Sequence, residues 1–295
     1  FDLPNPSILP APPISSFYLQ EIDNIVFLLD EPKKQFTALE IQQTFLEFKE
    51  KHTDYIFYYT DGSVADGKSA AAVVSNIYKK QNRVNDDHSI FSAELIAIHG
   101  ALKHIMKTDN KKLVICSDSA SALKAIQTKK REKHNIVYRI KKSLNRAQQR
   151  GKSVILLWIP GHSGIPGNEE ADQFAKSALD LQPRNHLDLP FQDFATLLRR
   201  KFLELRQFEW DAHQNSYFHR IKPKIGHLFS SKQDSRRKEV VLARLRMGAT
   251  LLTHSYLMDK QPPPTCYHCH PPTPFTIQHF LIDCTRHTHH RRHIT

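Results

Sequence analysis

The sequence predicts an α/β fold, in which a mixed five-stranded sheet carries flanking helices. A mostly helical basic region and a small tail follow the sheet. Two observations predict the sheet. Three strand-like runs follow one another between residues 55 and 89, and two further runs then alternate with helical patterns up to residue 178. Successive runs with short turns indicate antiparallel pairing, whereas alternation with helices indicates a layered sheet with parallel strands.

The composition is strongly basic. Lysine and arginine number 42 against 30 aspartates and glutamates, which gives the 295 residues a formal net charge of +12. This balance favours a polyanionic partner, and nucleic acid before a membrane surface. No apolar run approaches the roughly 18 residues of a membrane span, and the first residues lack a signal-peptide pattern. We therefore expect an intracellular protein of the nucleus or cytoplasm, which is not secreted and has no membrane partner.

Residues 1–50 are expected to form a proline-rich linker and a lead-in helix. Four of the first twelve residues are proline, a composition typical of extended segments. Apolar residues recur on a broad helical stripe over residues 36–51, which predicts a helix there. The chain begins with Phe1 instead of methionine, so we expect a piece of a longer protein.

Over residues 51–181 the predicted order of elements is β-β-β-α-β-α-α-β-α. Residues 55–60 and 69–76 are rich in strand-forming or small side chains, and a third strand is expected within 77–89. Ser92 is expected to cap a helix over 91–105. The remaining elements are a strand at 112–116, helices at 119–127 and 136–150, a strand at 154–159 and a last helix that begins near residue 168.

The stretch from Trp158 to Ala175 joins a strand to a helix through a loop that contains three glycines. Asn168 is a good N-cap, and acidic residues follow it in the first helical turn. The loop carries His162, and the helix carries Asp172 about one turn from its start. One interpretation is a surface loop beside a solvated acid. The other is a mobile histidine and a fixed carboxylate at the mouth of a site.

Three further acids stand where an α/β sheet gathers its ligands. Asp61 and Asp118 each follow a strand, and Glu94 opens a helix. Together with Asp172, four gathered carboxylates would repel one another, and a hard divalent cation makes such a cluster favourable. Two Mg²⁺ ions about 4 Å apart can activate a water and stabilise the leaving 3′-oxygen of a phosphodiester. Each acid alone is equally consistent with a solvated surface residue.

Four motifs in this order and spacing resemble type 1 ribonuclease H over residues 55–179: TDGS at 60–63, SAEL at 92–95, SDS at 117–119 and GHSGIPGNEEAD at 161–172. The resemblance implies a ribonuclease H-like fold. It also implies endonucleolytic cleavage of the RNA strand of an RNA–DNA hybrid with two Mg²⁺ ions, which Mn²⁺ can replace. It places the metal-binding catalytic acids on Asp61, Glu94, Asp118 and Asp172, and the catalytic histidine on His162.

Contacts with the hybrid are expected beside the first acid and in the basic loop 129–134. The chain between Asp118 and Trp158 is short for ribonucleases H that carry an extra basic protrusion. The basic loop and the helix after it are therefore candidates for gripping the substrate, although either could instead be a solvated basic face. The residues assigned to nucleic-acid binding are Gly62, Ser63, Lys129, Lys130 and Arg131.

Residues 182–260 are expected to form a basic helical region. Residues 197–213 follow a helical pattern, and residues 220–260 contain ten lysines and arginines against three acids. A further helix is predicted over residues 240–252, where Arg244 and Arg246 interrupt an apolar face. These arginines are interpreted either as phosphate contacts or as the solvated face of an amphipathic helix.

Residues 261–295 contain the pattern Cys266-x2-Cys269-x9-His279-x4-Cys284. Three thiolates and an imidazole can complete a closed tetrahedral zinc site, so the pattern predicts a zinc-binding tail. Competing ligands, or free thiols in an unstructured tail, are the alternatives. The histidines that could compete are His268, His270 and His287.

This tail, together with the run VLARLRMGATLLTHSYL at 241–257, resembles the region after ribonuclease H in non-LTR retrotransposon polyproteins. The resemblance implies that a reverse transcriptase domain was once joined before residue 1. It also leaves a rival to the enzyme: a catalytically inactive remnant that binds nucleic acid without cutting it.

Overall fold

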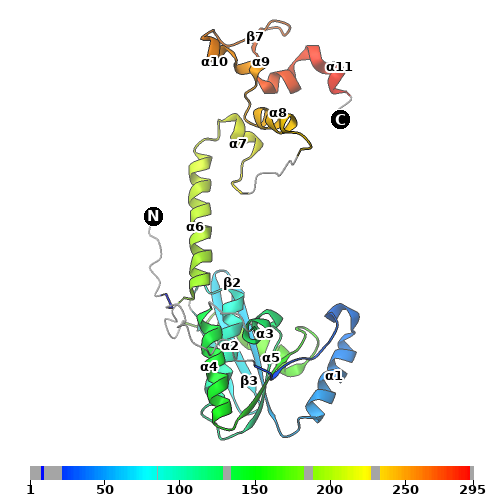
Figure 1. Ribbon diagram of the computed structural model, residues 1–295, viewed down its shortest axis with the longest axis vertical. Coiled ribbons are helices and arrows are strands. Elements are labelled where there is room, and N and C mark those ends of the chain that lie inside the picture. The colour runs from blue at the N-terminus through cyan, green and yellow to red at the C-terminus, as the bar shows by residue number, and fades with distance from the viewer. Residues whose placement is uncertain are drawn as a thin grey trace. The chain divides into compact units, whose positions relative to one another are not determined.

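The computed structural model describes residues 8–9, 22–84, 86–128, 134–182, 189–226 and 233–292. The chain divides into two compact units, Phe1–Leu198 and Arg199–Thr295 (Figure 1). The first unit holds a six-stranded mixed sheet with helices on both faces, so the predicted α/β fold class is confirmed. Among the described residues, none of the helices is both long and apolar enough to cross a membrane.

The strands lie in the order β1-β6-β5-β2-β3-β4. Strands β2, β3 and β4 form the predicted antiparallel meander, and β5 pairs parallel to both β2 and β6. Their bounds are Ile25–Phe27 for β1, Ile56–Ala65 for β2, Lys68–Ser75 for β3, Lys79–Val84 for β4, Lys112–Ser117 for β5 and Ser153–Trp158 for β6.

The expected count of five strands was wrong, because the segment read as a linker contributes β1. Ile25 of β1 lies opposite Leu156 in parallel register with β6. A strand of three residues is too short to show the period-2 pattern that identifies strands in a sequence. Its strand conformation depends on pairing with β6, a partner far away along the chain.

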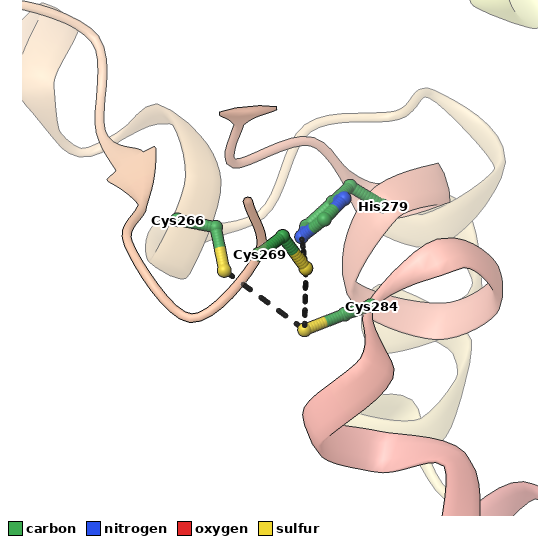
Figure 2. A group of neighbouring side chains, drawn as sticks. All are labelled: Cys266, Cys269, His279 and Cys284. Carbon is green, nitrogen blue, oxygen red and sulfur yellow. Dashed lines mark hydrogen bonds between the residues drawn. The ribbon is translucent and has the colours of Figure 1, made fainter. Parts of the chain in front are cut away.

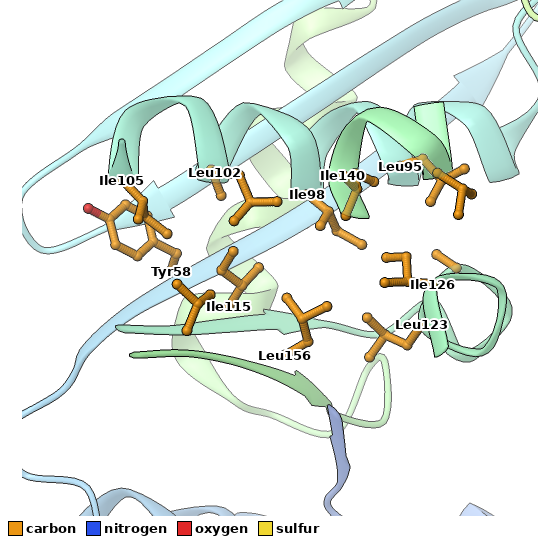
Figure 3. Close-up of a cluster of buried hydrophobic side chains, with 14 of the residues drawn as sticks. Tyr58, Leu95, Ile98, Leu102, Ile105, Ile115, Leu123, Ile126, Ile140 and Leu156 are labelled. Atoms are coloured by element: carbon orange, nitrogen blue, oxygen red, sulfur yellow. The ribbon is translucent and has the colours of Figure 1, made fainter. Parts of the chain in front are cut away.

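Two helical layers cover the sheet. Helices α2 (Ile90–Ile105), α3 (Ala120–Gln127) and α4 (Asn135–Gln149) share one apolar core with one face of the strands. Ile115 and Leu156 point into that core, whereas Cys116 and Leu157 point to the other face, as strand alternation requires. In Figure 3, fully buried side chains of α2 lie over these strands: Leu95, Ile98, Leu102 and Ile105.

The opposite face is covered by helices from the two ends of the first unit. Helix α5 (Pro166–Ala178) packs against β2 and β3. Helix α1 (Ala38–Glu50) buries Ile41 and Phe45 in a second cluster with strand residues. Thr37 and Glu40 form a capping box at the start of α1, which satisfies orphan backbone donors there. The predicted lead-in helix is therefore confirmed.

Two predicted helix caps were wrong. Helix α5 begins at Pro166 with Ile165 as its N-cap, so Asn168 lies inside that helix. Helix α2 begins at Ile90, and its N-cap is Ser89, whose side chain accepts from the backbone nitrogen of Ser92. Ser92 is fully buried inside the helix and forms a hydrogen bond with His134 Nε2 at 3.1 Å. Ser92 therefore lies inside the first turn of α2 and is not its cap.

The second unit consists mainly of short elements. Helix α6 (Phe191–Asp211) begins in the first unit and ends in the second. The helix expected over 240–252 is split, because Gly248 adopts a left-handed φ of 71° between α8 and α9. The other bounds are Tyr217–Ile221 for α7, Arg236–Arg246 for α8, Leu251–His254 for α9, Tyr256–Asp259 for α10, Thr265–Cys266 for β7, Thr273–Pro274 for β8 and Thr288–Arg291 for α11.

Candidate functional site

Three of the predicted acids meet at one edge of the sheet. In the parallel pair β2 and β5, Thr60 lies opposite Ser117, so Asp61 and Asp118 occupy the next position on each neighbouring segment. Glu94 reaches the same place from the second turn of α2. Asp61, Glu94 and Asp118 each offer a carboxylate oxygen, and these atoms lie within 4.8 Å of one another.

Burial makes these carboxylates hard to ionise. Burial, with the nearby charges of Asp118 and Asp172, raises the pKa of Asp61 from 3.8 to about 8. Burial also raises the pKa of Glu94 well above its ordinary value, and the charges of Asp61 and Asp118 act in the same direction. Oε2 of Glu94 is buried without a hydrogen-bond partner among the described residues. A divalent cation would relieve both the repulsion and this unpaired oxygen.

Asp118 has neighbours that favour its charged form. Burial raises the pKa of Asp118, while a hydrogen bond with Asn168 and the nearby His162 favour its charged form. Its backbone carbonyl accepts from Trp158 Nε1 at 3.0 Å. Side chains and backbone from β6 and α5 thus fix the segment that follows β5.

Asp172 stands in a neighbouring group and not among those three acids. Its carboxylate lies with His162 and Glu169 in a second group whose candidate ligand atoms are within 4.8 Å of one another. Lys176 donates to Asp172 Oδ2 at 2.6 Å. Asp172 is still near enough to raise the pKa of Asp61, so the two groups share one electrostatic site.

Glu169 was missed in the sequence analysis. Its Oε1 accepts from the backbone nitrogen of Gly164 at 3.3 Å, and its Oε2 lies 4.0 Å from His162 Nδ1. It stands three residues before Asp172 on α5, and residues at this spacing share one helix face. That spacing was the available signal, but a first-turn glutamate was interpreted only as a helix-dipole partner.

His162 projects from the loop before α5. Its side chain is 73% exposed, and its backbone has a φ of 50°, in the left-handed region. The ring is therefore accessible to a bound substrate beside the acids. The backbone that carries it is held by several hydrogen bonds.

Of the residues expected to contact nucleic acid, two lie beside the acids and three lie outside the described part of the chain. Gly62 is buried, and Ser63 is partly buried beside Asp61. In the basic helix α4, Lys141 is 2% exposed and its Nζ donates to the Thr128 carbonyl at 2.6 Å, so this cation is structural. The basic-loop residues Lys129, Lys130 and Arg131 lie outside the described residues.

The cysteine pattern of the tail closes into one cluster (Figure 2). Sγ of Cys284 lies 3.9 Å from Sγ of Cys266 and 4.0 Å from Sγ of Cys269, and Cys269 Sγ lies 3.7 Å from His279 Nε2. Ligands about 2.3 Å from a tetrahedral zinc ion lie about 3.8 Å apart, so these separations fit zinc. His268 is engaged with Arg286.

Comparisons with known proteins agree with this geometry. Residues 53–180 match the family RNase H. A 120-residue stretch, 40% of the chain, is 32% identical to the Pol polyprotein of Ovine maedi visna related virus (strain South Africa) and spans 10% of the length of that polyprotein. The first unit thus has a six-stranded sheet consistent with the RNase H fold, and residues 53–180 within it are matched to the RNase H family.

Proposed function

We propose that residues 53–180 cleave the RNA strand of RNA–DNA hybrids as a metal-dependent endonuclease. The observation that carries this proposal is the group of three carboxylates, Asp61, Glu94 and Asp118, of which the first two are buried and the third partly buried, with ligand atoms within 4.8 Å. Such a group costs free energy in the absence of a cation, so a folded chain that retains it implies a metal partner. The match to RNase H supports the choice of substrate.

The chemistry of the donor set fits Mg²⁺, with Mn²⁺ as a substitute. Asp61, Glu94 and Asp118 would hold the ions, with Asp172 as the flanking ligand. When bound, two Mg²⁺ ions would supply an activated water and stabilise the leaving 3′-oxygen.

His162 is proposed to move a proton at its exposed imidazole. The 73% exposure of its side chain gives the ring access to the leaving group or to the cleaved product. Glu169, with Oε2 4.0 Å from Nδ1, can orient the ring. Proton transfer of this kind contributes typically about 10²–10⁴-fold to a rate.

Selection of the hybrid is proposed to depend on duplex shape. Recognition of RNA-containing duplexes uses phosphates and 2′-hydroxyls more than base identity. Gly62 and Ser63 lie beside Asp61 and are the proposed contacts to the strand that is cut. The basic residues Lys129, Lys130 and Arg131 are proposed to contact the backbone of the paired strand.

The C-terminal unit is proposed to bind zinc and additional nucleic acid. Cys266, Cys269, His279 and Cys284 would hold one Zn²⁺ in a closed structural site. No residue of α8 is buried, and Arg244 and Arg246 on this helix are the proposed phosphate contacts. We further propose a retrotransposon polyprotein of the nucleus or cytoplasm as the source, with a reverse transcriptase domain before this chain. The Pol polyprotein relative supports the polyprotein context.

A labelled RNA–DNA hybrid tests the nuclease. The wild-type protein should cut the RNA strand in Mg²⁺, and EDTA should stop the reaction. Asp118→Asn should remove cutting while the fold persists, because an amide cannot supply the charge that holds two cations. Asp109→Asn changes an exposed aspartate away from the site and serves as the matched control.

Two outcomes would count against the proposal. Substantial Mg²⁺-dependent cutting by folded Asp118→Asn protein would reject the ligand assignment, and equal cutting of double-stranded DNA would reject the substrate. Binding of hybrid without any cutting would establish the rival, a nucleic-acid-binding remnant.

A further inference from the structure

The segment before the RNase H match contributes directly to the loop that carries His162. Residues 53–180 match the family, yet β1 and α1 lie at residues 25–50. Side chains of Lys33 and Gln42 in this segment reach the backbone of loop 160–164. The contacts join residues 121 or more positions apart in the chain.

Each backbone carbonyl from Pro160 to Ser163 accepts a side-chain donor. Ser163 Oγ donates to the Pro160 carbonyl at 2.5 Å. Lys33 Nζ donates to the carbonyl of Gly161 and lies 3.4 Å from that of His162. Gln42 Nε2 donates to the carbonyl of Ser163 at 2.9 Å. Three of the four carbonyls therefore depend on donors from outside the matched residues.

The ends of the loop are anchored by the same segment. Ile159 and Ile165 flank the loop and are buried at 0% and 1% exposure. Both pack in one apolar cluster with Ile41 and Phe45 of α1. Helix α1 is thus held against the loop by burial, which positions Gln42 on the turn between its two buried residues.

The loop needs this support because its conformation is strained. His162 has a φ of 50°, and the left-handed conformation is disfavoured for residues other than glycine. Such a conformation persists only where the surroundings over-determine it. The fit is close as well: a Cβ on Gly164 would lie 2.3 Å from Gln42 Nε2.

We propose that Lys33 and Gln42 are positioning residues. They hold the backbone of the His162 loop, so the exposed imidazole projects from a fixed position. The inference rests on the proposed nuclease function for its effect on rate. It does not require that function for its effect on the loop. Neither residue is shown in contact with the acids, so both are proposed to act through the loop backbone that carries His162.

The test compares neighbouring residues of the same type. Gln42→Glu replaces the amide donor by a carboxylate of nearly the same shape, and Lys33→Ala removes the ammonium. Gln43→Glu and Lys34→Ala are the controls, because both residues are exposed and contact no loop carbonyl. Lys33→Arg retains a donor and should restore the wild-type rate. Thermal unfolding of each variant confirms that it is folded.

The two test variants should lower kcat for hybrid cleavage on the order of tenfold with KM within about twofold, as expected from loss of orientation. The controls should match the wild type. In a His162→Ala background, Gln42→Glu should cause no additional loss, because a residue that acts through His162 has no effect without it. An equal loss in both backgrounds, or an equal loss in Gln43→Glu, would overturn the inference.

Amide hydrogen exchange of residues 161–164 gives a readout independent of cleavage. Exchange should be faster in Gln42→Glu than in wild type and unchanged in Gln43→Glu. A wild-type protein that does not cut hybrid would contradict the proposed function. The exchange measurement would still decide whether Lys33 and Gln42 hold the loop backbone in place. Unchanged exchange in folded Gln42→Glu and Lys33→Ala proteins would show that these residues do not hold the loop.

Discussion

A Cβ atom on Gly62 would lie 2.5 Å from the backbone nitrogen of Glu94 and 2.8 Å from the carbonyl carbon of Ala93. Strand β2 and the start of helix α2 therefore meet backbone to backbone, and only glycine allows this approach. The Gly62 backbone also hydrogen-bonds the Glu94 carboxylate. One small residue thus sets the separation between Asp61 and Glu94, which are adjacent to this contact.

Gly62→Ala should displace α2 from β2 and weaken both stability and metal binding. Overpacking of this kind costs about 1–3 kcal/mol, measured as the free energy of unfolding in urea. Gly100→Ala on the same helix is the control, since its Cβ would meet only a methyl group of Val73 at 3.4 Å. Alanine also stabilises a helix relative to glycine by roughly 1 kcal/mol. A Gly62→Ala protein as stable as Gly100→Ala would contradict the close approach.

Asp61→Asn should stabilise the protein in metal-free buffer at neutral pH. The folded state raises the pKa of Asp61 from 3.8 to about 8, so the carboxylate destabilises the fold increasingly as pH rises from 3.8 to about 8 and fully above that range. The gain should therefore be present at pH 7.5 and absent near pH 4. Added Mg²⁺ should raise the melting temperature of the wild type more than that of the variant. A less stable Asp61→Asn protein in EDTA at pH 7.5 would refute this account.

His99 provides a pH dependence remote from the acids. Burial, with Lys103 and Arg139 nearby, lowers its pKa from 6.5 to about 4. The unfolded chain then binds a proton that the folded chain does not, so stability falls as pH drops from 6.5 to 4. Replacing this histidine in His99→Gln should remove on the order of 1 kcal/mol of the loss between pH 7.5 and 5. Parallel stability curves for wild type and variant would exclude His99 as a cause.

One zinc ion per chain is expected in protein purified without chelator, measured by native mass spectrometry. Cys269→Ser should lose it, because Cys269 contacts both Cys284 and His279 in the cluster. His287→Ala should keep it, since His287 lies outside the four clustered ligands. Zinc removal should disorder the tail and leave hybrid cleavage by the first unit intact. Zinc retained by Cys269→Ser would contradict the ligand set.

The sequence predicted what depends on local pattern. Helix α2 was predicted because its apolar residues recur at helical spacing. Asp61, Glu94 and Asp118 were predicted to cluster because they stand near the ends of predicted strands or at the start of a predicted helix, although β2 continues past Asp61 to Ala65. The cysteine spacing likewise predicted four ligands that the structure brings together. In each case the signal lies within a few residues of the feature.

What the sequence did not reveal depends on distant partners. Strand β1 exists because β6 offers an open edge, and the role of Gln42 depends on a carbonyl 121 residues away. Asp172 lies in a group with His162 and Glu169, and its carboxylate accepts from Lys176, a contact that the order of the motifs does not reveal. Gly248 was a local signal for a break in the helix expected over 240–252, but the apolar pattern across this range predicted one continuous helix.

The three residues of β1 also govern how copies of the protein behave toward one another. Strand β6, with the sequence SVILLW, would otherwise present a hydrophobic edge, and such an edge pairs readily with a strand from another chain. β1 covers it with backbone hydrogen bonds, whereas the opposite edge strand β4 carries Lys79, Lys80 and Arg83. One edge of the sheet is shielded by pairing and the other by charge. A chain shortened to residues 53–180 would expose the apolar edge of β6, and self-association would then limit its solubility before any loss of catalytic residues mattered.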